Sequence, residues 1–321
     1  MEIIQGIDRL KAPFKNAVVT LGNFDGVHLG HQKIFARLKE EAVRLNGQGV
    51  VITFEPHPLK ILSPERRPPL LTPFRKKLVL FEKSGIEFVL CIEFSKAFSE
   101  ISPSEFVQGI LIDKVGARKV IVGYNYHFGK GKGGDVRTLK KLCDLHHVDV
   151  EVVDALRVDH TTVSSSKLRE LIREGHVEDA SKLLGRDYPI IGKVIVGAKR
   201  GHTLGFPTAN LEISDELYPK KGVYAVEVVW GERTFNGVAN VGFNPTFSAQ
   251  GGEKGLFSLE VYILNFNQDI YGEEIQISFR RRIRDEVRFD SPSRLIEQIR
   301  KDIEWARANV FDAKPASIPN G

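Results

Sequence analysis

Two patterns of hydrophobic and polar positions follow one another along the chain and change near residue 185. In the first part, short continuous apolar runs alternate with stretches whose apolar residues recur every three or four positions. Continuous runs predict buried strands, and the longer period predicts helices. The predicted strands cover residues 17–21, 49–54, 88–92, 119–123 and 150–153, and the predicted helices cover residues 34–45, 73–83, 104–115 and 136–146. Strands that alternate with helices predict an α/β domain with a parallel sheet covered on both faces.

The second pattern begins at Asp187, where strand-like stretches follow one another with turn residues between them. The strands predicted here cover residues 190–196, 223–229, 235–241, 257–264 and 274–279, and only residues 293–308 have helical spacing. Successive short strands with one terminal helix predict a small antiparallel barrel. We therefore expect one domain at residues 1–185, a second at residues 186–312, and a disordered tail at residues 313–321.

The composition fits two globular domains inside a cell. The chain has 321 residues, of which 42% are hydrophobic, so it can bury a sizeable core in each domain. A net charge of +5 suits anionic nucleotides and nucleic acid equally. Cys91 and Cys143 have no zinc-binding spacing and no disulfide framework, which favours a reducing compartment. Neither a signal peptide nor a membrane-spanning run is visible, so we expect a cytoplasmic protein.

The sequence GNFDGVHLGH at residues 22–31 stands between the first predicted strand and the first predicted helix. Glycines in such a loop let the backbone approach a polyphosphate closely. The amides and the dipole of a helix N-terminus favour anionic oxygens, and His28 and His31 would point to one side there. The loop therefore predicts a nucleotide-phosphate site. Two histidines beside a glycine-rich turn are also compatible with ordinary surface or core positions.

This loop resembles the GxFDxxHxGH signature of the HxGH-type nucleotidyltransferase superfamily. Members of that superfamily join the α-phosphate of a nucleoside triphosphate to a second phosphate and release pyrophosphate. The resemblance implies a Rossmann-like first domain in which His28 and His31 stabilise charge on the α-phosphate during an in-line attack. The residues that it implies in nucleotide and phosphate binding are Gly22, Phe24, Asp25 and Gly26.

A second glycine-rich loop, residues 124–135, follows the predicted strand that ends at Gly123. It contains G-x-G-x-x-G, but five residues separate Gly123 from the glycine run, whereas a dinucleotide-binding loop turns directly off its strand. We expect a flexible cationic loop that closes over phosphates, with a solvated hairpin as the alternative. The loop resembles the VGxxFxFGxxxxGD segment of bacterial flavin adenylyltransferases. This resemblance implies that Asn125 and Asp135 contact flavin mononucleotide or ATP.

The sequence VSSSKLR at residues 163–169 precedes a short helical pattern. In an ordinary helix, one of these serine hydroxyls would cap the N-terminus. The segment also resembles the (I/S)SSTxIR motif of the nucleotidyltransferase superfamily, with Ser166 in place of Thr and Leu168 in place of Ile. The resemblance implies a second anion site, in which Ser165, Ser166 and Arg169 hold the departing pyrophosphate.

The sequence GAKRGHTLGFPTANL at residues 197–211 is the most specific string of the second domain. Its first part is a loop with glycines and basic residues, which suits a polyphosphate. Its second part offers the oxygens of Thr208 and Asn210, which can hold a Mg²⁺ ion that keeps its waters and phosphate ligands. An ordinary turn is the alternative for this tetrad.

The same string resembles riboflavin kinase, for which GFPTANL is close to diagnostic. The resemblance implies that Gly197, Lys199 and Gly205 bind the phosphates of a nucleotide. His202 stands where that family commonly has arginine, so its role is left open, and Lys199 or Arg200 could take its place.

Glu260 belongs to a predicted strand in which its apolar neighbours share one face and Glu260 shares the other with Tyr262. From this pattern alone it is a solvent-facing glutamate. The strand and residues 269–272 resemble the riboflavin kinase segment (V/L)ExxxLxFxxDLYG, which implies that Glu260 is the general base. Arg284 and Glu286 lie in a stretch that looks like the flavin-side loop of the same family.

Together, the two resemblances correspond to the bacterial bifunctional riboflavin kinase and FAD synthetase family. They imply that a six-stranded antiparallel barrel phosphorylates riboflavin with ATP to FMN, and that the first domain converts FMN and ATP to FAD and pyrophosphate. The implied cofactor is Mg²⁺, and the implied ligands are riboflavin, FMN, FAD and ATP, with no nucleic acid and no membrane. One alternative is an enzyme with one inactive half. Another is a flavin-sensing or nucleic-acid-binding protein, motivated by the arginines at 280–284.

Overall fold

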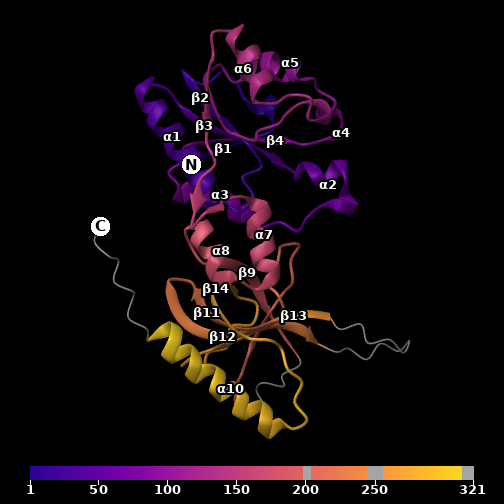
Figure 1. The fold of residues 1–321 in the computed structure, drawn as a ribbon, viewed down its shortest axis with the longest axis vertical. Coiled ribbons are helices and arrows are strands. Elements are labelled where there is room, and N and C mark those ends of the chain that lie inside the picture. The colour runs from indigo at the N-terminus through magenta and orange to yellow at the C-terminus, as the bar shows by residue number, and fades with distance from the viewer. Residues whose placement is uncertain (198–203, 245–255, 313–321) are drawn as a thin grey trace. The chain divides into compact units, whose positions relative to one another are not determined.

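Figure 1 shows the computed structural model of the chain, which describes residues 1–197, 204–244 and 256–312. The expected disordered tail at residues 313–321 lies outside the described residues, as do Lys199 and His202. The chain forms two compact units, Met1–Ser165 and Ser166–Gly321. Among the described residues, no helix combines the length and the apolar character that crossing a bilayer requires.

A six-stranded parallel sheet with the order β1-β4-β3-β2-β5-β6 forms the centre of the first unit. Its strands are β1 (Glu2–Gln5), β2 (Ala17–Leu21), β3 (Gly49–Glu55), β4 (Phe88–Glu93), β5 (Ala117–Gly123) and β6 (Asp149–Val153). The helical segments are η1 (Ile7–Arg9), α1 (Leu29–Arg44), α2 (Pro58–Leu62), η2 (Pro64–Arg66), α3 (Phe74–Lys83), α4 (Lys96–Ser99), α5 (Pro103–Glu105), η3 (Phe106–Lys114), η4 (Lys130–Lys132) and α6 (Val136–Asp144). Strands β7 (Arg157–Val158) and β8 (Thr161–Thr162) form a separate ribbon. The predicted α/β fold with a parallel sheet is confirmed.

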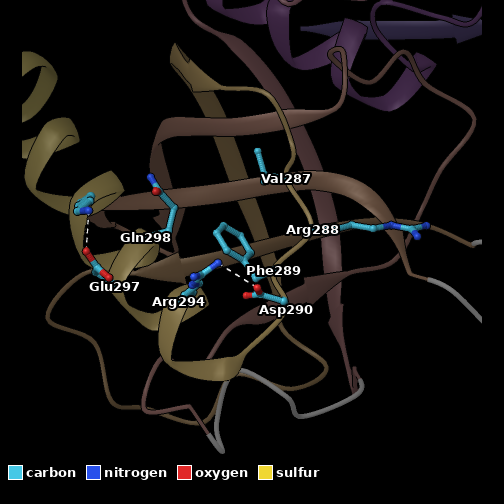
Figure 2. A pocket seen from close by; sticks show the side chains of 8 residues that line it. Val287, Arg288, Phe289, Asp290, Arg294, Glu297 and Gln298 are labelled. Carbon is cyan, nitrogen blue, oxygen red and sulfur yellow. Dashed lines mark hydrogen bonds and ion pairs between the residues drawn. The ribbon is translucent and has the colours of Figure 1, made fainter.

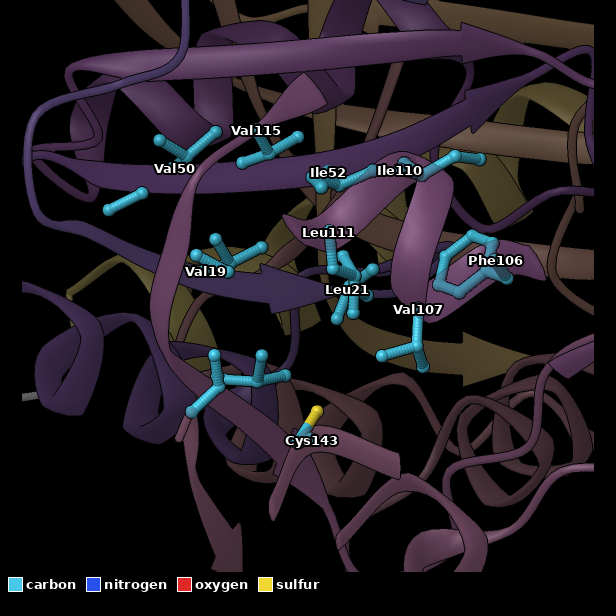
Figure 3. Close-up of a cluster of buried hydrophobic side chains, with 14 of the residues drawn as sticks. Val19, Leu21, Val50, Ile52, Phe106, Val107, Ile110, Leu111, Val115 and Cys143 are labelled. Atoms are coloured by element: carbon cyan, nitrogen blue, oxygen red, sulfur yellow. The ribbon is translucent and has the colours of Figure 1, made fainter. Parts of the chain in front are cut away.

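Both faces of the sheet are buried under apolar side chains. Successive residues of a strand point to opposite faces. Val19 of β2 packs with Phe106 and Cys143 in one cluster (Figure 3), whereas its neighbour Val18 packs with Phe35 in a second cluster. Because both directions lead into a core, these strands are continuous apolar runs in the sequence.

The strand order reverses between β2 and β5, which are hydrogen-bonded neighbours. From β2 the chain continues to β3 and β4 on one side, and β5 and β6 lie on the other side. Loops that leave a parallel sheet at such a reversal diverge and provide a crevice for ligands. The loops at residues 22–31 and 124–135 follow these two strands, so the topology brings both predicted loops to the same edge of the sheet.

Six antiparallel strands close into a barrel in the second unit, with the order β10-β13-β12-β11-β14-β9. The strands are β9 (Tyr188–Ile195), β10 (Ala209–Leu211), β11 (Gly222–Trp230), β12 (Arg233–Asn244), β13 (Leu256–Ile263) and β14 (Glu274–Arg284). Helices α7 (Ser165–Glu174) and α8 (Val177–Leu184) precede the barrel, and α10 (Pro292–Ala306) with the π-helical η5 (Arg307–Phe311) follows it. Ile303 and Ala306 of α10 pack with Val223 and Val238 of the barrel. The predicted barrel and terminal helix are confirmed.

Several short elements of the fold differ from the sequence prediction or add to it. The short strands β1 and β10 were not predicted, because the first has only two apolar residues and turn-forming residues flank the second. The helix predicted at 104–115 is a single capped α-turn, α5, which continues as the π-helix η3. Helix α8 was not predicted either. The division between the compact units places α8 with the barrel, whose strands β9 and β14 it contacts. The domain boundary after residue 185 remains a prediction.

Candidate active sites

The loop after β2 has an unusual backbone conformation that contacts from elsewhere in the unit hold in place. Phe24 and Val27 have positive φ angles of 49° and 41°, which residues other than glycine rarely adopt. Asp25 is buried, and its carboxylate accepts hydrogen bonds of 3.1 and 2.9 Å from two backbone N–H groups in the segment before α3. The hydroxyl of Ser165 donates to the carbonyl oxygen of Asp25 at 2.8 Å. The protein itself therefore fixes this loop.

His28 and His31 form a stacked pair at the N-terminus of α1. Their ring centroids are 3.6 Å apart, and their planes differ by 16°. His28 is the N-cap of the helix, because its Nδ1 accepts a hydrogen bond of 3.3 Å from the backbone N–H of His31. An accepting ring nitrogen carries no proton, so the neutral ring of His28 keeps its proton on Nε2. The pair thus places an N–H donor at the positive end of α1, where anionic oxygens are favoured.

Two glycines leave the space that the aromatic rings of this loop occupy. A Cβ at position 30 would lie 3.2 Å from Nδ1 of His28. A Cβ at position 22 would lie 3.1 Å from the ring of Phe24, which in turn packs edge-on against His31 at 5.2 Å. Gly26 has a φ of 91°, a conformation that glycine adopts without strain. Two of these glycines, Gly22 and Gly30, therefore leave room for the aromatic rings, and Gly26 allows the positive φ angle of the backbone. Their close approach to a nucleotide remains a prediction.

The second glycine-rich loop is closed as a hairpin, the alternative that the sequence left open. The backbones of Phe128 and Gly134 exchange hydrogen bonds of 2.9 and 3.0 Å. A Cβ at Gly134 would lie 2.6 Å from the ring of Phe128, which is buried. Lys130 forms an ion pair of 2.7 Å with Glu100. In the structure, Gly134 therefore makes room for Phe128.

Asn125 and Asp135 stand at the two ends of the second loop. Asn125 is exposed, and its carbonyl oxygen lies 2.9 Å from Nδ1 of His127. Asp135 is the N-cap of α6 and accepts hydrogen bonds from the backbone N–H and the hydroxyl of Thr138, at 2.8 and 2.9 Å. These hydrogen bonds lower the pKa of Asp135 below its ordinary value. Asp135 thus caps helix α6, whereas Asn125 faces solvent.

The residues of the predicted pyrophosphate site fall on both sides of the division between the units. Ser165 ends the first unit and contacts the loop at residues 22–31, which we call the signature loop. Ser166 and Arg169 lie on α7 in the second unit, where Ser166 is exposed and Arg169 is buried. The role of these three residues remains a prediction.

Three polar side chains lie in one row across strands β10, β13 and β12. Glu260 is the register partner of Asn210 on one side and of Asn240 on the other. The strand neighbours on the opposite face are buried: Leu211, Ala239, Val241, Leu259 and Val261. Directly opposed residues of antiparallel strands have Cβ atoms about 5 Å apart, so the three polar side chains can act together. The predicted alternation around Glu260 is confirmed.

Asn210, at one end of this row, belongs to the GAKRGHTLGFPTANL string. Gly197 lies against Asn210, because a Cβ on Gly197 would be 2.3 Å from Nδ2 of that carboxamide. Thr208 is half-buried and directly precedes β10. Gly205 is exposed and has a φ of 80°. The structure thus brings Gly197 and Asn210 together next to Glu260, while Lys199 lies outside the described residues.

The segment after β14 lines a pocket of about 440 Å³ beside α10 (Figure 2). Its lining residues are Val287, Arg288, Phe289, Asp290, Arg294, Glu297, Gln298 and Lys301. Of the two residues predicted for the flavin-side loop of the kinase, Glu286 reaches the polar row, since its Oε1 lies 3.5 Å from Nδ2 of Asn240. Arg284 instead holds the buried carboxylate of Asp302, with N–O distances of 2.7 to 3.1 Å. This ion pair ties α10 to the barrel.

Sequence reasoning missed Asn240 and Lys77. Asn240 is a polar residue in a predicted strand, but only the register of β12 against β13 places it beside Glu260. Lys77 is buried in α3 and contacts the signature loop. A signal for it existed, because Phe74, Lys77 and Phe81 recur at helical spacing and a lysine therefore falls on the apolar face.

Comparisons with known proteins find two family models in the chain. A family model described as FAD synthetase matches residues 10–167, and one described as riboflavin kinase matches residues 184–310. The chain is 39% identical over 295 residues to the bifunctional riboflavin kinase/FMN adenylyltransferase of Listeria monocytogenes serovar 1/2a, with 91% of this chain and 92% of the relative covered. It is 37% identical over 306 residues to that of Buchnera aphidicola subsp. Schizaphis graminum, with 95% and 97% covered.

A solved structure resembles this chain over both units. The crystal structure described as a macrolide-efflux protein from Streptococcus pneumoniae is 32% identical in sequence and superposes with a TM-score of 0.85. The match covers 96% of this chain and 99% of that one. The α/β unit and the barrel unit are therefore found together in at least one other protein.

The fold and the family matches define an enzyme that combines a nucleotidyltransferase domain with a kinase domain. The chain belongs to the family of bifunctional riboflavin kinase/FMN adenylyltransferases. Its ATP-dependent activities make FMN and FAD. The family, the fold class and both activities predicted from the sequence are thus confirmed.

Proposed function

We propose that the signature loop and the N-terminus of α1 form the adenylyltransferase site. A phosphate oxygen of FMN attacks the α-phosphate of ATP in line, a new P–O bond forms, and the bond to the β-phosphate breaks to release pyrophosphate. Negative charge grows on the α-phosphate oxygens during this step. His28 and His31, together with the first amides of α1, donate hydrogen bonds to those oxygens and lower the barrier. The stacked pair at the helix N-terminus supports this assignment.

The other predicted residues of this site bind the substrates. Gly22, Phe24, Asp25 and Gly26 shape the nucleotide side of the loop, Asn125 and Asp135 contact FMN or ATP, and Ser165, Ser166 and Arg169 hold the departing pyrophosphate. Asp25 acts through the backbone, because its carboxylate is already bonded to amides before α3. No covalent intermediate with the protein is required, so electrostatics and positioning carry the reaction.

Riboflavin is phosphorylated at the polar row of the barrel. Glu260 takes the proton of the attacking hydroxyl of riboflavin while the γ-phosphate of ATP is transferred. Thr208 and Asn210 offer a hydroxyl and a carboxamide oxygen, ligands that fit Mg²⁺, which when bound neutralises charge on the phosphates. Gly197, Lys199 and Gly205 bind the nucleotide phosphates. The close approach of Gly197 to Asn210, next to Glu260, supports this arrangement.

The flavin side of the kinase site is formed by the segment after β14. Glu286 extends toward the polar row and Arg284 stands at the start of the segment. The two domains are assigned to residues 1–185 and 186–312, and residues 313–321 to a disordered tail. We place the enzyme in the cytoplasm, with riboflavin, FMN, FAD and ATP as its ligands and without a nucleic-acid or membrane partner.

The arginine cluster that motivated a nucleic-acid-binding protein is engaged within the chain. Each arginine has an acidic partner: Arg280 pairs with Glu227, Arg281 with Glu178, Arg282 with Asp285, and Arg284 with Asp302. Arg281 also stacks over Trp305, 5.4 Å from its ring centroid. Guanidinium groups committed in this way are less available for phosphates of a nucleic acid, which supports the enzymatic assignment of the barrel.

Two substitutions test the assignments. The variant chains are incubated with riboflavin or FMN and with Mg-ATP, and the flavins are separated and quantified. We expect His28→Ala to lower the conversion of FMN to FAD by about 10²- to 10³-fold while FMN formation continues, because only the first reaction uses this charge stabilisation. We expect Glu260→Ala to lower FMN formation by about 10²- to 10⁴-fold and to spare FAD formation from FMN.

Wild-type protein is the reference in the same assay. Its accumulation of FAD from riboflavin shows that both active sites work under the conditions in which the variants are compared. Loss of both activities in either variant would contradict the assignment of one site to each domain.

A further inference from the structure

We infer that Lys77 is a positioning residue of the adenylyltransferase site, whose buried ammonium group holds the peptide unit between Asn23 and Phe24 in the orientation that phosphate binding needs. The inference rests on the proposed role of the signature loop and adds a residue from a different element to that site. Nothing in the motif itself includes this lysine, which follows the loop by about fifty positions.

Lys77 connects three elements through its ammonium group. It lies on the buried face of α3, and only 6% of it is exposed. Its Nζ donates to the carbonyl oxygen of Asn23 in the loop at 3.0 Å and to Oγ1 of Thr53 in β3 at 3.3 Å. The side chain also passes over Phe74, with Nζ 5.4 Å from the ring centroid. The loop is thus anchored to the sheet and to α3 at one point.

The charge of Lys77 is not explained by packing. Among the described residues, none forms an ion pair with it, and burial lowers the pKa of its ammonium group, against the more distant charges of Asp25 and Glu55. A buried ammonium group without a carboxylate partner costs stability, and an apolar side chain of similar length would fill the same space. An apolar residue could not donate the hydrogen bond that Lys77 gives to the carbonyl oxygen of Asn23. We therefore assign to the lysine the task of holding the loop.

The peptide unit that Lys77 holds carries the N–H group of Phe24, for which the described residues offer no acceptor. In a planar trans peptide, C=O and N–H point in opposite directions. The hydrogen bond from Lys77 to the Asn23 oxygen therefore turns the N–H of Phe24 away from α3. Within the described part of the chain, no group accepts a hydrogen bond from this N–H. Oδ1 of Asn23 is likewise buried without a hydrogen-bond partner among the described residues. Two unsatisfied polar groups in one strained loop are expected where a ligand supplies the partners.

The ligand chemistry that fits is an anionic oxygen of a nucleoside triphosphate. An N–H next to the N-terminus of α1, close to a cation with no carboxylate partner, favours phosphate over any neutral group. Without Lys77, the peptide unit of Phe24 can rotate and present its carbonyl oxygen to the phosphate instead. Such a change repels the substrate oxygen and displaces the loop that carries His28 and His31.

The test compares Lys77→Met, Lys77→Gln and Lys77→Arg with Lys83→Met, which removes an exposed lysine from the same helix. Conversion of FMN to FAD is measured with kcat and KM for ATP, riboflavin phosphorylation by the same chain is the internal control, and Tm reports folding. We expect Lys77→Met to lower kcat for FAD formation about 10²-fold, as a displaced reactive group does. Lys77→Gln should show a smaller loss, and Lys77→Arg should stay within a few-fold of wild type. Riboflavin phosphorylation, Tm and Lys83→Met should be close to wild type.

Wild-type kcat in Lys77→Met would overturn the inference, as would a loss of kcat that follows a lower Tm and is not restored in Lys77→Arg. If Lys77→Met does not fold, the comparison of Lys77→Gln with Lys77→Arg decides in the same way. His28→Ala, assayed in parallel, separates this inference from the proposed function. Full adenylyltransfer in His28→Ala would overturn both, whereas its loss beside an active Lys77→Met overturns only the role of Lys77.

Discussion

The absence of a side chain at Gly30 leaves the space that the His28 ring occupies. Position 30 is the second residue of α1, and a Cβ there would lie 3.2 Å from both Nδ1 and Cε1 of His28. The ring cannot retreat easily, because His31 is stacked on it at 3.6 Å. The packing of the two histidine rings therefore favours glycine at position 30, whether or not a ligand is bound.

This geometry predicts an unusual combination of effects for Gly30→Ala. The added methyl group pushes the His28 ring aside, so we expect kcat for FAD formation to fall about tenfold or more, since misplaced catalytic groups are costly. Alanine is also the better helix former by about 1 kcal/mol, so Tm should stay unchanged or rise. Steady-state kinetics with FMN and Mg-ATP, together with thermal unfolding, would measure both.

The matched control is Gly109→Ala in η3, where a Cβ would meet no atom within 4 Å. It should leave both activities unchanged. A Gly30→Ala enzyme with wild-type kinetics would show that the ring position is not limiting.

The residues that the sequence predicts for the two proposed sites lie in local motifs, whereas the two residues that the structure adds to the proposal do not. His28, His31, Asn210 and Glu260 belong to contiguous motifs with distinctive local patterns. Asn240 and Lys77 act through register and through burial, which depend on contacts between elements that are far apart in the chain. Lys77 lies 54 positions from Asn23, and no local pattern encodes such a contact.

At the scale of elements, an ionic network ties α1 to the edge of the parallel sheet. Nζ of Lys119, at the start of β5, lies 3.0 Å from a carboxylate oxygen of Glu41 in α1 and 2.9 Å from one of Glu151 in β6. Arg44 also donates to Glu41, at 2.7 Å. The hydrogen bonds from Arg44 and Lys119 lower the pKa of Glu41 from 4.5 to about 2. The network therefore depends on Glu41 being ionised.

A pH dependence of stability follows from this lowered pKa. Because folding lowers the pKa, the contribution of Glu41 is complete above pH 4.5 and is lost as the pH falls toward 2. We expect Glu41→Gln to lower Tm by a few degrees at neutral pH, and the difference from wild type to shrink through this acidic range. Glu40→Gln, which affects an exposed pair on the same helix, should change Tm little at any pH. A difference in Tm that is the same at every pH would argue against this account.

The elements that the sequence predicted well are those with long, regular patterns. Strands β2 to β6 of the sheet and the terminal helix have continuous runs or clear helical spacing. Strand β10 has three residues and is recognisable only by its pairing with β9 and β13. Likewise, the buried pair of Arg284 and Asp302 joins elements 18 positions apart, so the sequence offered Arg284 only as a flavin contact.

At the scale of the whole molecule, the two activities are linked by FMN, the product of one and the substrate of the other. His28, His31 and Lys77 lie in the first unit, and Asn210, Asn240 and Glu260 lie in the second. Within the described residues, the polar row of the barrel is complete without a side chain from the first unit. Because His28→Ala and Glu260→Ala each change one of the two proposed sites, we expect one site to work while the other is inactive.

This independence predicts complementation between two inactive chains. His28→Ala makes FMN but converts little of it, and Glu260→Ala converts FMN but makes little. We expect a mixture of the two variants, given riboflavin and Mg-ATP, to accumulate FAD, because FMN released by one chain reaches the other by diffusion. FAD should appear after a lag that lengthens on dilution, since each FMN molecule must first leave its chain, and added FMN should abolish the lag. Each variant alone, at the same total concentration, is the control. The contrary result is a mixture that makes FMN but no FAD, although Glu260→Ala converts added FMN. It would mean that FMN is not released from the chain that forms it, so the two active sites would not act independently.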